Sequence, residues 1–298
     1  MGSGPYRGFE MSERPGRIVQ GNMIGLSMPD IDKWSDRVET VLGQNPSAFT
    51  GPGTNTYIVG TSRAPLILDT GQGLESYLPL LQSALDGRTL SEIVLTHAHP
   101  DHIGGCPQLR EVFGRLPVKK RRWAGMDDKA GDDLVEIDHG DVIETEGATL
   151  EAIHTPGHAE DHLCYLLREE RAIFTGDVVL GAGTTVIPEH GGDLLDYMKS
   201  LEHLLQLEPA VLYPAHGPAI HDATGKIREY IAHRRLREEQ ILDLLREGIA
   251  LVGEMVERMY ADVPQFLHPA AATSVRSHLR KLEREGRARL DGESWSLA

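Results

Sequence analysis

Short apolar runs alternate with amphipathic helical segments through the first 225 residues of the chain. The runs are bounded by Gly, Pro or Asp, as buried β-strands usually are, whereas the helical segments repeat Leu or Tyr three or four residues apart. Strands are therefore expected at residues 53–59, 65–71, 91–96, 148–153, 162–167, 171–174 and 211–213, with a further candidate at 117–123, and helices at 74–85, 103–113 and 194–207. Two series of strands, each interleaved with helices, predict two packed sheets with helices on the outside.

The pattern changes after Gly225. A long charged helix is expected over residues 226–249, and its apolar side is formed by Ile227, Tyr230, Ile231, Leu236, Ile241, Leu244 and Leu245. Two shorter helical patterns at 251–260 and 268–285 and a β-ribbon at 287–297 follow. This order predicts a small winged-helix unit, so we expect a first domain over residues 1–225 and a second over 226–298. We expect the tail to cap a cleft or to mediate a homodimer.

The chain has 298 residues and a formal net charge of −15 that is unevenly distributed. Residues 226–298 hold 13 basic and 12 acidic residues, whereas residues 1–225 hold 17 and 33. An acidic body argues against broad non-specific binding to nucleic acid, although a local basic groove remains compatible with it. Cys106 and Cys164 are too few for a disulfide framework, and we interpret both as packed thiols.

No apolar run approaches the ~18 residues of a membrane-spanning helix. The segment Met1–Glu13 lacks the apolar core of a signal peptide and the acid-free pattern of a transit peptide. We therefore expect a cytoplasmic protein with no membrane partner.

Candidate chemistry is concentrated in the segment Thr96-His97-Ala98-His99-Pro100-Asp101-His102, where the expected strand 91–96 ends. Strand ends in α/β sheets are where ligands bind. Imidazoles two residues apart on an extended segment can face one cation, and the Asp-His pair that follows can turn toward a second one. This spacing is typical of a metal site.

Four other expected strands end in a polar residue beside a glycine, where the backbone can turn sharply and present a side chain. These ends are Asp69-Thr70-Gly71, Thr155-Pro156-Gly157-His158, Thr175-Gly176-Asp177 and Pro214-Ala215-His216-Gly217. A lone histidine of this kind is more often structural. Because the His97–His102 motif is present, we interpret His158, Asp177 and His216 as ligands, and Asp69 as a residue that orients a metal-binding histidine.

The ordered motifs T-H-A-H-P-D-H, T-P-G-H, T-G-D and P-A-H-G resemble those of the metallo-β-lactamase superfamily over residues 50–220. The resemblance implies an α/β fold, the αββα sandwich, with two metal ions in a cleft at one edge. It implies one zinc held by His97, His99 and His158, a second held by Asp101, His102 and His216, and Asp177 as a bridge. Iron or manganese are alternatives to zinc. The predicted chemistry is hydrolysis by a metal-bound hydroxide, with Asp101 as a catalytic residue that orients the nucleophile.

Two positions argue against antibiotic hydrolysis. Asp177 stands where one type of β-lactamase needs a cysteine, and Ile103 stands where another has a second histidine. Segments 45–46, 53–57, 157–162, 181–186, 213–214 and 279–286 extend the resemblance, over nearly the whole chain, to the branch of lactamase-like endoribonucleases found in animal mitochondria. That branch implies cleavage of single-stranded RNA, but it also contains fungal thioesterases that release polyketide acids from a carrier protein. Departures at residues 47–52 and 188–192, in expected cleft loops, leave the substrate open.

Several residues have two interpretations. His162 either contacts the substrate as a second catalytic residue or supports a neighbouring ligand. The run 119–123, Lys-Lys-Arg-Arg-Trp, either grips phosphates and stacks a base or is a charged, solvated edge strand. An RNA path would continue over Arg276, Arg280 and Lys281. We expect the remaining motif-free residues to serve packing, the surface or a turn: His139, His203, His221, His233, Asn55 and Thr56.

Three functions remain open on the sequence. The leading one is a metal-dependent endoribonuclease acting on single-stranded RNA, the second is a hydrolase of small esters or acyl thioesters, and the third is a non-catalytic binding module that uses the tail. The complete ligand set argues against the third. The acidic body favours the second, whereas the whole-chain resemblance favours the first.

Overall fold

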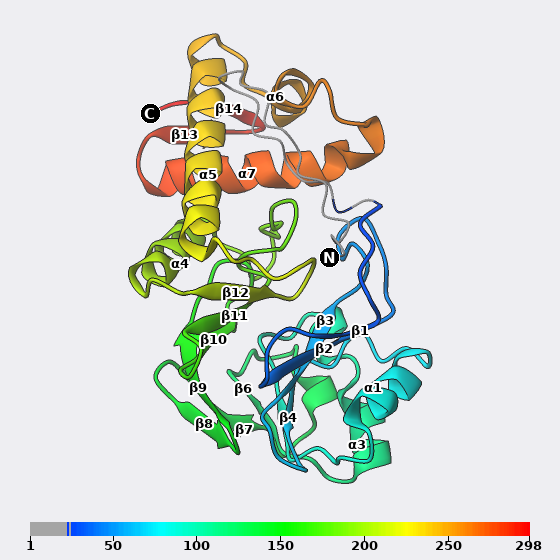
Figure 1. The fold of residues 1–298 in the computed structure, drawn as a ribbon. Coiled ribbons are helices and arrows are strands. Elements are labelled where there is room, and N and C mark those ends of the chain that lie inside the picture. The colour runs from blue at the N-terminus through cyan, green and yellow to red at the C-terminus, as the bar shows by residue number, and fades with distance from the viewer. Residues whose placement is uncertain (1–22, 24) are drawn as a thin grey trace, which may run out of the picture.

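The computed structural model describes residue 23 and residues 25–298, and the start of the chain that bears on targeting lies outside these residues. Two sheets form the body of the molecule (Figure 1). The first has seven strands in chain order: β1 (Ile31–Lys33), β2 (Val38–Leu42), β3 (Asn55–Val59), β4 (Leu66–Leu68), β5 (Ile93–Val94), β6 (Val118–Lys120) and β7 (Val135–Glu136). The second has five, in the order β12 (Val211–Pro214), β11 (Ala172–Gly176), β10 (Leu163–Leu167), β9 (Ala148–His154) and β8 (Val142–Thr145).

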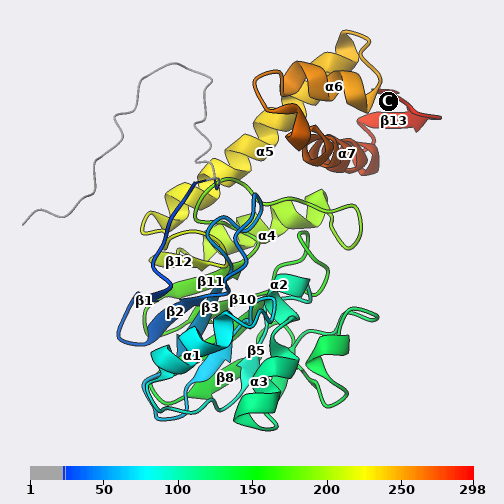
Figure 2. The same ribbon diagram turned by 90° about the vertical axis from the view of Figure 1, so that its right-hand side faces the viewer.

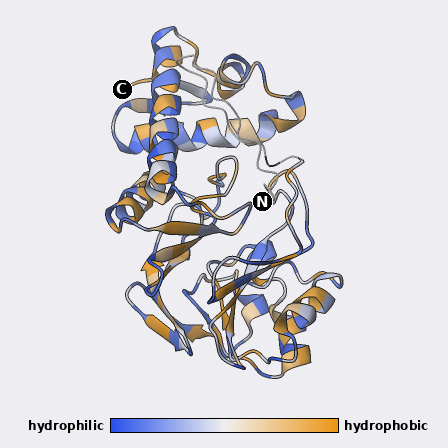
Figure 3. Ribbon diagram, in the orientation of Figure 1, coloured by the Kyte–Doolittle hydropathy of each residue, from blue (hydrophilic) through white to orange (hydrophobic). Residues whose placement is uncertain are grey.

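Each face of the two sheets is covered. Apolar side chains that alternate along β3 point to opposite sides, so Tyr57 and Val59 pack between the sheets and Ile58 packs outward. Helices α1 (Tyr77–Leu85) and α3 (Cys106–Phe113) cover the outer face of the first sheet, and α4 (Leu194–Gln206) covers that of the second. The predicted αββα sandwich is therefore confirmed, and its strands are largely hydrophobic (Figure 3).

The tail forms a separate hydrophobic cluster beyond the sandwich (Figure 2). It consists of α5 (Ala223–Arg246), α6 (Val252–Met259), a 3₁₀ turn η2 (Gln265–Leu267), α7 (His268–Arg284) and the ribbon of β13 (Ala288–Asp291) and β14 (Ser294–Leu297). Trp295 of the ribbon and Leu279 of α7 are buried together in this cluster. The winged-helix expectation is thus confirmed.

Helix α5 belongs to both parts of the molecule. Ile227 and Tyr230, near its start, pack with the second sheet, whereas Ile241 and Leu245, near its end, pack with α6 and α7. The division between residues 225 and 226 therefore falls inside a continuous helix, and two independent folding units at that boundary stay a prediction.

Some local expectations were wrong. Leu74 was expected on the buried face of a helix, but α1 begins at Tyr77 and Leu74 is 37% exposed. Leu236 was placed on the apolar side of α5, yet it is 39% exposed because the buried face rotates along so long a helix. One of the two interpretations of the run 119–123 was a charged edge strand, whereas β6 lies between β5 and β7. No helix among the described residues is both long and apolar enough to cross a membrane.

Candidate metal centre

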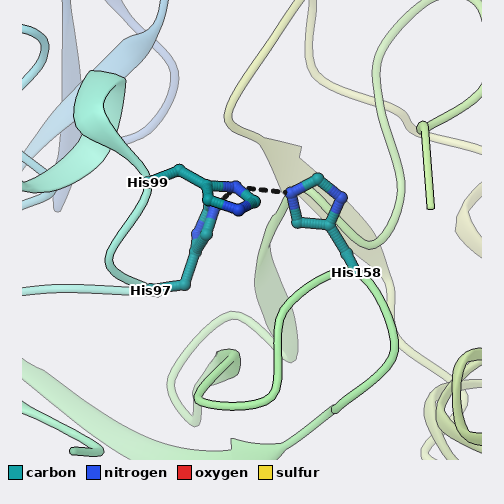
Figure 4. A group of neighbouring side chains, drawn as sticks. All are labelled: His97, His99 and His158. Carbon is teal, nitrogen blue, oxygen red and sulfur yellow. Dashed lines mark hydrogen bonds between the residues drawn. The ribbon is translucent and has the colours of Figure 1, made fainter. Parts of the chain in front are cut away.

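Three histidines from two loops point toward one another (Figure 4). His97 and His99 lie on the loop after β5, just before the short helix α2 (Pro100–Ile103), and His158 lies on the loop after β9. The Nδ1 atom of His99 is 2.9 Å from Nε2 of His97 and 2.9 Å from Nε2 of His158. A neutral imidazole has one N–H, so hydrogen bonds alone satisfy this arrangement poorly, whereas a shared cation would accept all three lone pairs.

A second group lies next to the first. The Nε2 atom of His216, from the loop after β12, is 3.4 Å from Oδ2 of Asp101, and Nε2 of His102 is 3.5 Å from the same oxygen. Asp177, at the end of β11, stands between the two groups. Its Oδ1 atom is 3.1 Å from Nε2 of His216, and its Oδ2 atom is 3.4 Å from Nε2 of His158.

Two buried atoms of this cluster, Nε2 of His102 and Oδ1 of Asp177, make no hydrogen bond of normal geometry among the described residues, although they lie 3.5 Å apart. A buried polar atom left unpaired costs about 1–3 kcal/mol. Both atoms belong to residues that sequence analysis predicted as ligands, and both face the interior of the cluster. The donor set therefore fits a bound cation, and all seven predicted ligands are brought together.

Asp69 lies where the orienting role that was predicted for it would place it. One carboxylate oxygen accepts a hydrogen bond from the amide of Thr96, and the other lies 2.8 Å from Nδ1 of His102. A proton on Nδ1 leaves the Nε2 lone pair of His102 directed into the cluster. Asp69 adopts a φ of +60°, a left-handed conformation that is uncommon outside glycine.

Asn55 and Thr56 have functions that the turn interpretation missed. The side-chain amide of Asn55 donates to the carbonyls of Pro214 and Gly217, which flank His216 some 160 residues away in the chain. Thr56 instead bonds the carbonyl of Val41 and the Tyr77 hydroxyl. The adjacent Thr54 donates to Oδ2 of Asp101. No local sequence pattern reports contacts of such long range.

Electrostatics divides the histidines into two kinds. Burial, reinforced by repulsion from neighbouring imidazoles, lowers the pKa of His97 well below its usual value and that of His99 to about 4. Both are therefore neutral near pH 7, which is the form that binds metal. Burial acts in the same direction on His102 and His216, but nearby carboxylates outweigh it and raise the pKa of both. These two imidazoles lower the pKa of Asp177 despite its burial.

The structure does not support a direct catalytic role for His162. Its ring is fully buried, Nδ1 lies 3.0 Å from the Thr155 hydroxyl, and Nε2 accepts a hydrogen bond from the amide of Asp177. Gly176 makes this contact feasible, because a Cβ there would lie 2.5 Å from Nε2 of His162. This geometry favours the second of the two roles left open, in which His162 supports the neighbouring Asp177.

Each basic residue of the predicted RNA path lies within ion-pair distance of a carboxylate. Lys119 pairs with Glu92, Lys120 with Asp127 and Asp161, Arg121 with Asp138, and Arg122 with Glu136. In the tail, Arg276 and Arg280 share Glu189, and Lys281 pairs with Glu238 and Glu285. Trp123 is 4% exposed, which leaves no face for a base. The edge-strand interpretation of the run 119–123 was therefore wrong, and the phosphate-grip interpretation finds no support in these pairs.

Both cysteines are buried free thiols, as predicted. Burial raises the pKa of Cys106 and of Cys164 to about 12, so neither forms an appreciable thiolate near neutrality. They lie in the cores formed by α3 and by the second sheet.

A cleft of about 500 Å³ opens beside the cluster. Asp101, His158, Asp177 and His216 lie at one side of it. Its other walls are largely apolar and come from three parts of the chain. These are Met23 with residues 48–50, residues 183–186, and several tail residues between Tyr260 and Ser274. His233 and Arg234 of α5 also line it, and neither was predicted, because no motif distinguishes them from other charged residues of that helix.

An αββα sandwich with a histidine–aspartate cluster at the strand ends defines a hydrolase of the metal-binding type. The chain belongs to the metallo-beta-lactamase superfamily, whose family profile matches residues 49–216. A second profile, the beta-lactamase associated winged helix domain, matches residues 252–295. Metal binding is typical of this superfamily, which agrees with the cluster.

Relatives cover most of the chain. It is 38% identical over 261 residues to a beta-lactamase-like protein 2 homolog of Caenorhabditis elegans, covering 86% of this chain and 87% of that protein. It is 40% identical over 243 residues to an atrochrysone carboxyl ACP thioesterase of Claviceps purpurea, covering 79% and 76%. A crystal structure of a beta-lactamase domain protein from Burkholderia ambifaria shares the fold at 18% identity, with a TM-score of 0.79 and coverage of 94% and 97%.

The pairing of Lys120 predicts a stability effect. The Lys120 and Asp161 side chains are completely buried, with 2.9 Å between Nζ and Oδ2. Replacing Lys120 with Met leaves a buried carboxylate without its cation, so the free energy of unfolding should fall by about 3–5 kcal/mol in urea denaturation. Arg122→Met is the control, because Arg122 and Glu136 are half-exposed and such pairs contribute at most about 1 kcal/mol. Equal stability of the two variants would contradict the structural role of Lys120.

Proposed function

We propose that this chain is a dinuclear metal-dependent hydrolase of acyl thioesters or esters with a bulky apolar acyl group. In this proposal one ion is held by His97, His99 and His158, and the other by Asp101, His102 and His216, while Asp177 contributes to both. The convergence of the His97, His99 and His158 nitrogens supports this assignment most strongly. Imidazole and carboxylate donors suit zinc, with iron or manganese as alternatives.

Bound ions would supply Lewis acidity and a nucleophilic water at neutral pH. The chain's own residues hold the reacting groups. Oδ2 of Asp101 is fixed by the Thr54 hydroxyl at the cleft and is placed to orient the attacking water and to take its proton. His162 holds the Asp177 backbone in place from below. Addition of water to the acyl carbon then breaks the carbon–sulfur or carbon–oxygen bond and releases an acid and a thiol or alcohol.

The cleft supports an acyl substrate over RNA. Apolar side chains such as Phe49, Leu180, Val263 and Leu267 dominate its walls, which suits a hydrocarbon or aromatic group. A path for RNA needs unpaired cations, and each basic residue considered for that role pairs with a carboxylate. The similarity to a protein named as a thioesterase supports the same choice.

Metal content tests the ligand assignment. The full-length protein should take up two ions per chain, and His97→Ala or Asp177→Ala should lower that number, because each removes a ligand. Elemental analysis after dialysis against zinc measures the stoichiometry. His139→Ala, at an exposed site away from the cluster, should bind as the unchanged protein does. Absence of uptake by the unchanged protein would refute the proposal.

The substrate class is tested by comparing hydrolysis of acyl probes with cleavage of RNA by the same protein. Zinc-loaded protein should hydrolyse acyl-thioester and nitrophenyl-ester probes and leave labelled single-stranded RNA intact. Its rates should change little with salt, because no set of counterions is released on binding. Cleavage of RNA with all acyl probes intact would reverse the choice and restore the endoribonuclease.

The tail wall of the cleft predicts acyl selectivity. Leu267 lines the cleft, whereas the neighbouring Phe266 does not and is 69% exposed. Leu267→Ala should lower kcat/KM about tenfold for a naphthoyl or decanoyl thioester, since a buried leucine contributes roughly 1.5–3 kcal/mol. Acetyl thioester should be unaffected. Phe266→Ala is the matched control, and an equal loss in both variants, or for both substrate sizes, would remove the tail from the acyl site.

A further inference from the structure

Three consecutive backbone carbonyls separate the tail from the metal centre. The carbonyl of Thr185 accepts a hydrogen bond from Nη2 of Arg234 on α5, at 2.5 Å. The next carbonyl, that of Val186, lies 2.8 Å from Nδ1 of His158. The third, that of Ile187, accepts from the Ser277 hydroxyl on α7, at 3.1 Å. The outer two therefore bond the tail and the middle one bonds the candidate ligand.

This alternation is what an extended backbone produces, because successive peptide groups point to opposite sides. Holding the carbonyls of Thr185 and Ile187 toward the tail turns the carbonyl of Val186 toward His158. A carbonyl only accepts, so Nδ1 of His158 carries the proton and Nε2 presents its lone pair to the cluster. The Thr185 hydroxyl lies 3.3 Å from the same nitrogen, but the carbonyl of Val186 is nearer and favours this tautomer and ring orientation of His158.

The contacts are buried, which makes their loss consequential. Thr185, His158, Arg234, Ser277 and Ile187 are each at most 9% exposed, so water does not readily replace a missing donor. Arg234 is itself fixed, with its guanidinium 5.3 Å from the Tyr197 ring. The Ser277 hydroxyl also lies 2.9 Å from the carbonyl of Thr273, so its single proton is shared. Arg234 is therefore the stronger of the two anchors.

The same helix holds the loop further upstream. The Tyr230 hydroxyl, one turn before Arg234 on α5, bonds the amide of Leu180 and the carbonyl of Gly183. The segment 180–187, which follows Asp177, is thus hydrogen-bonded to the tail at four residues: Leu180, Gly183, Thr185 and Ile187. Other tail contacts, such as Arg284 with Asp193, lie beyond this segment.

We propose that Arg234 and Ser277 are positioning residues that hold His158 through the carbonyls of residues 185–187, so that the winged-helix tail sets the metal affinity of the sandwich domain. The inference rests on the proposed role of His158 as a metal ligand. It assigns the tail a second contribution besides the wall of the cleft. Replacing a residue that fixes a metal-binding histidine typically weakens metal affinity about 10- to 100-fold.

Metal affinity of the full-length protein tests the inference. Zinc affinity is measured by competition with a chromophoric chelator, and the visible spectrum of the cobalt-loaded protein reports the ligand environment without reference to activity. Arg234→Met keeps the aliphatic stem but removes the donors, and it should weaken binding of the first ion about tenfold, the lower end of the range for such partners. Ser277→Ala should weaken it about threefold, as expected for one shared hydrogen bond.

Matched controls separate positioning from general damage. Arg235→Met changes the next residue of α5, whose side chain is 67% exposed and pairs with Glu202, and Thr273→Ala changes a site one turn before Ser277. Both should bind zinc as the unchanged protein does. Arg234→Lys restores a donor on a similar stem and should recover part of the affinity. Urea unfolding of the metal-free variants shows whether each is folded.

The outcomes are distinguishable. Weaker binding in Arg234→Met and Ser277→Ala alone, with an altered cobalt spectrum, supports the inference. Equal affinity of these variants and the unchanged protein overturns it while leaving the proposed function intact, and so does an equal loss in the two controls. If the unchanged protein binds no metal, the proposed function itself fails. Should Arg234→Met not fold, Ser277→Ala and Arg234→Lys still decide the question.

Discussion

The architecture depends on crowding seven candidate ligand side chains into one largely buried cluster at the edge of the cleft. Burial disfavours charge on His97 and His99, and Nε2 of His102 and Oδ1 of Asp177 make no hydrogen bond of normal geometry. Hydrogen bonds within the cluster satisfy these nitrogens poorly. Nδ1 of His99 faces Nε2 of both His97 and His158, and one proton cannot serve both contacts. In the proposed site, cations satisfy lone pairs that the protein does not. The surrounding fold then serves to hold those lone pairs in place.

Strand ends from both sheets bring the cluster together, so the packing between the sheets is part of the site. Tyr57 and Phe174 meet at 4.9 Å between ring centroids, and the Tyr57 hydroxyl bonds the carbonyl of Pro214. Asn55 bonds the same carbonyl and that of Gly217. One strand of the first sheet thereby fixes the loop that carries His216 from the second. A change at this interface would therefore reach the ligands without touching them.

The sequence predicted the sandwich, the winged-helix tail and the clustered ligands well, because each leaves a local signal in apolar periodicity or in residue spacing. It failed where the deciding contact lies far away in the chain. Strands β1, β2, β7 and β8 were not predicted from the apolar pattern, although β2 has five residues. The run 119–123 looked like an available positive charge, but its carboxylate partners are scattered between residues 92 and 161. Asn55 is likewise informative only once its partners near residue 216 are known.

The tail illustrates why composition alone was a poor guide to mechanism. Arg276 and Arg280 suggested part of a path for RNA, yet these two residues and Arg284 pair with acidic residues of the 189–193 loop and hold it against α7. Behind these pairs, the tail forms one wall of the cleft and holds the carbonyls beside His158. In the function proposed above, the tail would couple the shape of the substrate site to the support of the candidate metal ligands. Sequence change in the tail would then alter acyl selectivity and metal affinity together, because α5 and α7 contribute to the cleft and to the contacts with residues 185–187.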